Sequence, residues 1–109
     1  SLKRDDLIRI LTEPKNALTK QFSLLMSYDK VALEFQPEAL EVIADNALEL
    51  EIGARGLRSV MERIMTKIMY EVPSDSKIEK VIITKECAAG LEPPWIVHKP
   101  KPQIDPDAS

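Results

Sequence analysis

Between residues 54 and 72, apolar residues recur at the spacing of a helix that packs along one face. They fall at the i, i+3, i+4 and i+7 positions of a helical repeat, and they are Leu57, Val60, Met61, Ile64, Met65, Ile68, Met69 and Val72. Gly53 stands just before this row, where glycine commonly ends a preceding helix. The pattern therefore predicts a long helix that opens at Ala54 and Arg55.

Two helices are predicted near the N-terminus. Asp5 and Asp6 suit the first turn of a short helix, which must end before Pro14 because proline cannot continue it. Pro14 then suits the opening of a second helix that runs to about Ser27. Its predicted core face consists of Leu18, Phe22, Leu25 and Met26.

A strand and a third helix are predicted in the middle of the chain. Residues 31–35 alternate between apolar and other side chains, as in a strand with one buried side. Pro37 opens the helix and Gly53 ends it. We expect its inward face to hold Leu40, Ile43, Ala44, Ala47 and Leu48, and its solvent face to hold Glu38, Glu41, Asp45 and Glu49.

The C-terminal third predicts the remaining strands and a tail. Residues 80–84 are rich in β-branched side chains, and residues 95–98 form a plausible third strand. So few strands need helices to cover them, which predicts an α+β domain dominated by four helices with a two- to three-stranded sheet. We assign residues 1–98 to this domain and 99–109, which are polar and proline-rich, to a disordered tail.

Size and charge narrow the class of protein. A chain of 109 residues fits one domain and is too short for a complete motor ATPase. The formal net charge of −3 gives no general attraction to DNA or to an anionic membrane. No apolar run approaches the roughly 20 residues that span a bilayer, and the first residues lack a signal-peptide core. We therefore expect a cytoplasmic protein.

The sequence lacks the residues of several catalytic and metal sites. Its three glycines cannot form a glycine-rich phosphate loop, so we assign no catalytic residues. One histidine, His98, and one cysteine, Cys87, cannot supply a structural zinc site, so we expect no metal. His98 is interpreted as a strand-end residue, Cys87 as inert, and the four methionines as core filler, with a partner-binding groove as the alternative.

Arg55 is the strongest candidate for binding chemistry. It stands at the start of the long predicted helix, where unpaired backbone N–H groups and the helix dipole favour anions. A guanidinium there adds to an existing preference for phosphate. Two interpretations stay open at this point: a phosphate contact, or a tight turn between helices whose arginines simply face solvent.

Three stretches of sequence favour the phosphate contact. They are residues 7–22, residues 31–39, and Gly53-Ala54-Arg55-Gly56-Leu57-Arg58 with Tyr70-Glu71-Val72-Pro73 beyond it. In order and spacing they resemble the C-terminal small domain of the ClpX family of AAA+ protein unfoldases, over roughly residues 2–98. The resemblance implies that Arg55 is the second-sensor arginine, which approaches nucleotide phosphates, with Ala54 and Ile10 also at the nucleotide. Phe22 stands where the family often has tyrosine.

The resemblance also implies the cofactors and partners of a longer parent protein. That parent would bind ATP or ADP with magnesium between this domain and a large AAA+ domain hinged near residue 2. It would form a homohexamer, unfold protein substrates and work with the ClpP peptidase. We expect the fragment alone neither to hydrolyse ATP nor to bind it tightly.

Two alternatives are kept. One is the small domain of a related HslU-like unfoldase, although residues 14–18 favour ClpX. The other is a helix-turn-helix module in which Arg55, Arg58, Arg63 and Lys67 face nucleic-acid phosphates. The acidic face predicted for the third helix opposes the second alternative, because its carboxylates would repel DNA. We expect neither a nucleic acid nor a membrane partner.

Overall fold

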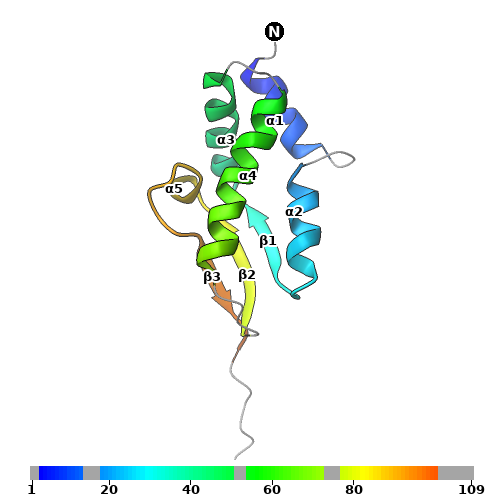
Figure 1. The fold of residues 1–109 in the computed structure, drawn as a ribbon, viewed down its shortest axis with the longest axis vertical. Helices are drawn as coiled ribbons and strands as arrows, with labels where there is room; N and C mark the ends of the chain where they lie inside the picture. The colour runs from blue at the N-terminus through cyan, green and yellow to red at the C-terminus, as the bar shows by residue number, and fades with distance from the viewer. Residues whose placement is uncertain (1–2, 14–17, 51–53, 73–76, 101–109) are drawn as a thin grey trace, which may run out of the picture.

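The computed structural model describes residues 3–13, 18–50, 54–72 and 77–100, and these residues contain five helices and three strands. In chain order they are α1 (Arg4–Thr12), α2 (Leu18–Ser27), β1 (Ala32–Phe35), α3 (Pro37–Glu49), α4 (Ala54–Glu71), β2 (Ile78–Ile83), α5 (Lys85–Ala88) and β3 (Trp95–His98). Figure 1 shows α4 running along the molecule beside the small sheet. The predicted α+β class is confirmed.

The three strands form one mixed sheet in the order β1-β2-β3. β1 pairs with β2 in parallel, whereas β2 and β3 are antiparallel. A parallel pair needs a long crossover connection, and here α3 and α4 lie in the chain between β1 and β2. The register aligns Leu33, Val81 and Ile96 across the sheet, which places one apolar row on the core side.

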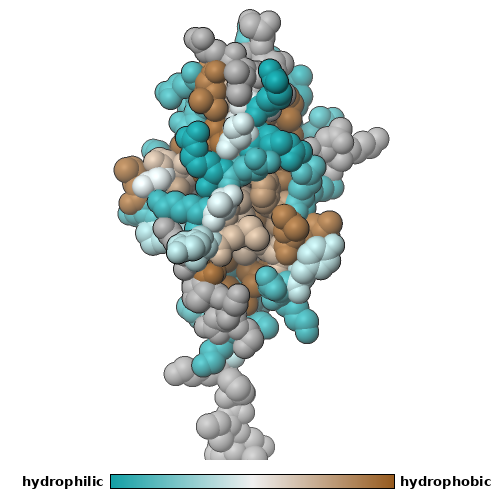
Figure 2. All heavy atoms as spheres, in the orientation of Figure 1, coloured by the Kyte–Doolittle hydropathy of each residue, from teal (hydrophilic) through white to brown (hydrophobic). Residues whose placement is uncertain are grey.

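The core lies between this sheet and the helices, while Figure 2 shows mostly hydrophilic and intermediate side chains along the outer face of α4. The largest fully buried side chains come from α1, α3, α4 and β2, with one polar residue at the end of β2: Leu7, Leu11, Ile43, Leu57, Met61, Met65, Val81, Ile83 and Thr84. The predicted apolar face of α4 is confirmed at Leu57, Val60, Met61, Met65 and Ile68, while Ile64 is only partly buried. The predicted solvent face of α3 is also confirmed, since all four of its acidic residues are exposed.

Three side chains predicted to face the core are instead exposed. Leu25, Leu48 and Met69 keep 47%, 36% and 49% of their accessible surface. Each is adjacent in sequence to a buried residue of the same helix turn, which is Met26, Ala47 or Ile68. Each exposed side chain therefore lies about 100° around its helix from a side chain that packs in the core. The interpretation of methionines as core filler is therefore right for Met26, Met61 and Met65 and wrong for Met69.

A short helix, α5, was not predicted. Thr84, expected as the last residue of a strand, is the N-cap of α5, and its hydroxyl accepts a 3.1 Å hydrogen bond from the backbone N–H of Cys87. Thr84 is 1% exposed, so this cap lies inside the core. The signal that could have revealed α5 is a threonine followed by helix-forming residues directly after a strand.

Several predicted boundaries can be compared with the structure only in part. α2 begins at Leu18 among the described residues, and the predicted start at Pro14 and the predicted stop at Gly53 lie outside them. The backbone N–H of Lys99 donates to the carbonyl of Lys77 at 2.6 Å, just past the predicted end of the domain. Residues 101–109 of the predicted tail are also outside the described part. No helix within the described ranges is long and apolar enough to cross a membrane.

Candidate nucleotide-sensing site

Arg55 lies in the first turn of α4, and it is exposed. Its helix begins at the same end of the molecule as α1, as Figure 1 shows. Among the residues that the structure describes, none forms a hydrogen bond or an ion pair with the Arg55 side chain. Arg55 is therefore an exposed cation at a helix start, where the first N–H groups of a helix have no partner within the helix.

The two other residues predicted to lie at the nucleotide, Ala54 and Ile10, belong to different helices. Ala54 is the first residue of α4, and its side chain lies outside the described part of the structure. Ile10 lies in α1, where it is half-buried and packs against the core. Ile10 can therefore offer a ligand only apolar contact, and the polar contact of the predicted site comes from Arg55 and the start of α4.

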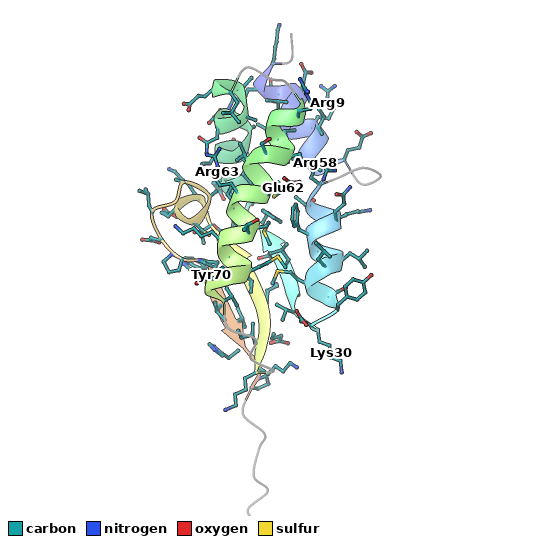
Figure 3. The ribbon with its side chains drawn as sticks, in the orientation of Figure 1. Arg9, Lys30, Arg58, Glu62, Arg63 and Tyr70 are labelled. Atoms are coloured by element: carbon teal, nitrogen blue, oxygen red, sulfur yellow. The ribbon has the colours of Figure 1, made fainter. Side chains whose placement is uncertain are left out.

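Arg58, one turn further along α4, is already engaged within the domain. Its Nη2 donates to Oε1 of Gln21 in α2 at 3.3 Å, and its Nη1 lies 3.6 Å from Oε1 of Glu62. Figure 3 shows Arg58 on the part of α4 that lies toward α2. The bond to Gln21 connects α4 to α2, whereas Glu62 lies one turn further along α4 itself. Arg58 therefore has a structural role that Arg55 lacks within the described residues.

The structure also places His98, Cys87 and the acidic side chains of α3. His98 is exposed at the end of β3, and Cys87 is buried in α5. Within the described ranges, no three side chains of the histidine, cysteine, aspartate and glutamate types gather closely enough to hold a metal ion. The four carboxylates of α3 are exposed, which weakens the helix-turn-helix alternative because DNA affinity depends on neutralised phosphates.

Comparison with known proteins decides the family. Residues 2–85 match the family described as the C-terminal, D2-small domain, of ClpB protein. The chain belongs to this family. Over 94 residues it is 42% identical to the ATP-dependent Clp protease ATP-binding subunit ClpX of Borrelia duttonii, and over 91 residues it is 51% identical to that of Bacteroides fragilis.

These relatives confirm the resemblance to ClpX that the sequence motifs indicate. Each match covers 84% of this chain but only 22% of the relative, so the chain spans about a fifth of the length of these proteins. What the family shows is a C-terminal small domain of the AAA+ type, consistent with the helices and mixed sheet described above. The role of Arg55 rests on its position and chemistry.

Proposed function

We propose that this chain is the nucleotide-sensing C-terminal domain of a ClpX-like ATP-dependent unfoldase. The observation that carries the proposal is the exposed Arg55 in the first turn of α4, with no partner among the described residues. Arginine at a helix start offers a planar fork of donors together with the positive end of the helix dipole. That combination suits the phosphate oxygens of ATP or ADP.

The nucleotide would lie between this domain and a large AAA+ domain of the same parent protein. On this side Arg55 would bind phosphate, the backbone at Ala54 would help to form the helix-start environment, and Ile10 would offer an apolar wall. Magnesium and the groups that act in hydrolysis would belong to the large domain, because the three glycines of this chain provide no phosphate-binding loop. Hydrolysis of the bound ATP would supply the free energy for protein unfolding.

The packing suggests how a phosphate contact would move the whole domain. Leu7 and Leu11 of α1 are 0% and 1% exposed and belong to the same core as Leu57 of α4. A pull on Arg55 would therefore act on α1 and α4 together, as one rigid body. We further propose that the parent forms a homohexamer, in which such rotations drive the unfolding of protein substrates for the ClpP peptidase in the cytoplasm.

The test compares two arginine-to-lysine variants of the full-length parent. Arg55→Lys should weaken nucleotide binding and ATP-driven unfolding, because lysine is a point charge that cannot replace a bidentate fork. Arg58→Lys should keep nucleotide affinity, since Arg58 contacts Gln21 and Glu62 inside the domain. In this chain alone, Arg55→Lys should change the free energy of unfolding by less than about 0.5 kcal/mol. Full unfolding activity in the Arg55 variant would refute the sensor role.

A further inference from the structure

A hollow of about 230 Å³ lies between α4, α5 and the segment of residues 89–94. Its floor is apolar, with the half-buried Ile64 above three buried side chains, Val60, Ile68 and Ala88. Its rim is polar, since the lining residues Arg63, Lys67 and Glu92 are exposed. Figure 3 shows Arg63 on the side of α4 toward α5.

The two cations of this rim are not neutralised within the described residues. Arg63 and Lys67 are one helical turn apart on α4, and no described residue forms an ion pair or hydrogen bond with either side chain. Glu92 is the acidic residue among those that line the hollow, so the rim keeps an excess of positive charge. A domain with a net charge of −3 thus carries a local cationic site beside an apolar depression.

The wall of the hollow formed by residues 89–94 is fixed by backbone geometry. Gly90 adopts a φ of +80°, and its N–H donates to the carbonyl of Cys87 at 3.0 Å. The next N–H, of Leu91, donates to the carbonyl of Glu86 at 2.8 Å. Two prolines follow, of which Pro94 is buried. The hollow is therefore preformed, so an occupant does not have to order this wall.

The size and surroundings of the hollow indicate its occupant. Pockets for whole small ligands span roughly 300 to 1,000 Å³, so this hollow suits a single apolar side chain better than a cofactor. Arg63 and Lys67 also border a shallower depression along α4, lined in addition by Ser59, Glu62, Thr66 and Tyr70. The two cations therefore stand between two depressions, which favours an extended ligand over a compact one.

We propose that this surface is a docking site for an acidic peptide segment that inserts one apolar side chain into the hollow. The apolar anchor packs on Ile64 and Ala89, which keep accessible surface in the hollow. Flanking carboxylates of the peptide pair with Arg63 and Lys67. Pairing of this kind is strongest at low salt, because exposed charges are screened over about 8 to 10 Å at 0.1–0.15 M. The site involves neither Arg55 nor nucleotide, so it stands independently of the function proposed above.

The test uses the 109-residue chain and a fluorescein-labelled hexapeptide with one leucine flanked by aspartates and glutamates. Fluorescence anisotropy should show saturable binding, weakened about tenfold when serine replaces the leucine. Arg63→Glu combined with Lys67→Glu should also weaken binding at least about tenfold. Lys20→Glu combined with Lys30→Glu is the matched control, since both lysines are exposed and lie outside the hollow. This control should bind the peptide within about twofold of the parent chain.

A third variant tests the hollow itself without reversing charge. Ala89 is exposed and lines the hollow, so Ala89→Phe should fill it and abolish the preference for the leucine peptide. Circular dichroism confirms that each variant is folded. Equal binding of the serine and leucine peptides, or unchanged affinity in the Arg63 and Lys67 double variant, would overturn the proposal. A labelled oligonucleotide that competes at the same site would overturn it in favour of a nucleic acid.

Discussion

Arg4 and Asp45 join α1 to α3 through a 2.6 Å hydrogen bond from Arg4 Nε to Asp45 Oδ1. Glu41, one turn earlier on α3, lies 3.6 Å from Arg4 Nη2. The bond to Asp45 and its charge raise the pKa of Arg4 further above its already high ordinary value. Because the pKa of Arg4 is raised, the pair with Asp45 stabilises the fold fully at any pH below the unfolded-state pKa of Arg4. This stabilisation is lost only as the pH rises through the folded-state pKa. It is therefore constant through the neutral and mildly alkaline range.

This pair predicts a salt-sensitive effect on stability. Arg4→Gln should lower the midpoint of denaturant unfolding slightly at low salt, because both partners are about half-exposed and exposed ion pairs contribute little. The difference should shrink in 1 M NaCl and should be equal at pH 7 and pH 9. Lys20→Gln, an exposed cation without a described partner, is the control. A difference that persists at high salt would show that Arg4 acts through packing rather than charge.

Truncating Met65 and truncating Met69 of α4 should cost very different amounts of stability. Met65 is 0% exposed and Met69 is 49% exposed, although they are one turn apart on the same helix. Met65→Ala should lower the free energy of unfolding by about 2 to 5 kcal/mol, the usual cost of emptying a buried site. Met69→Ala should cost less than about 1 kcal/mol. Urea unfolding of both variants measures this contrast, and equal costs would contradict the burial described here.

The contrast between Met65 and Met69 also shows what could be predicted from the sequence. Helical spacing identifies which face of α4 is apolar, since spacing depends only on the local chain. It does not show how wide a side of each helix the neighbouring elements cover, and that decides the exposure of Leu25, Leu48 and Met69 beside the buried Met26, Ala47 and Ile68. The parallel pairing of β1 and β2 was likewise unpredicted, because it depends on how α3 and α4 return the chain to the sheet.

The two candidate sites also differ in how far the sequence could predict them. The place of Arg55 at a helix start could be predicted, because Gly53 and the apolar row of the long helix lie on either side of it in the sequence, and its role stays a prediction. The hollow beside Arg63 could not, because its lining comes from α3, α4, α5 and the segment before β3. No sequence spacing connects Asn46, Arg63 and Pro94. Only the packing of α4 and α5 against α3 brings them together.

Removing the buried Thr84 cap should lower the free energy of unfolding. Thr84→Val keeps the shape of the side chain but leaves the Cys87 N–H without the 3.1 Å bond from the cap. We expect a loss of about 0.5 to 2 kcal/mol, the usual cost of removing the side-chain acceptor at a helix N-cap. Thr84→Ser keeps the hydroxyl and should retain most of the stability at this cap. Thermal unfolding of the two variants distinguishes them, and a more stable valine variant would contradict the capping role.

Two positions with positive φ predict changes of opposite sign. Gly90 has a φ of +80°, and a Cβ built there meets no atom within 4 Å, so Gly90→Ala tests the backbone alone. The left-handed conformation costs an ordinary residue about 1 to 2 kcal/mol, so the variant should lose roughly 1 kcal/mol. Lys30 has a φ of 61° and an exposed side chain. Lys30→Gly should therefore gain roughly 0.5 kcal/mol, since glycine adopts this conformation readily. Urea unfolding of both variants is the measurement, and destabilisation by Lys30→Gly would show that the lysine side chain contributes a contact that outweighs its backbone cost.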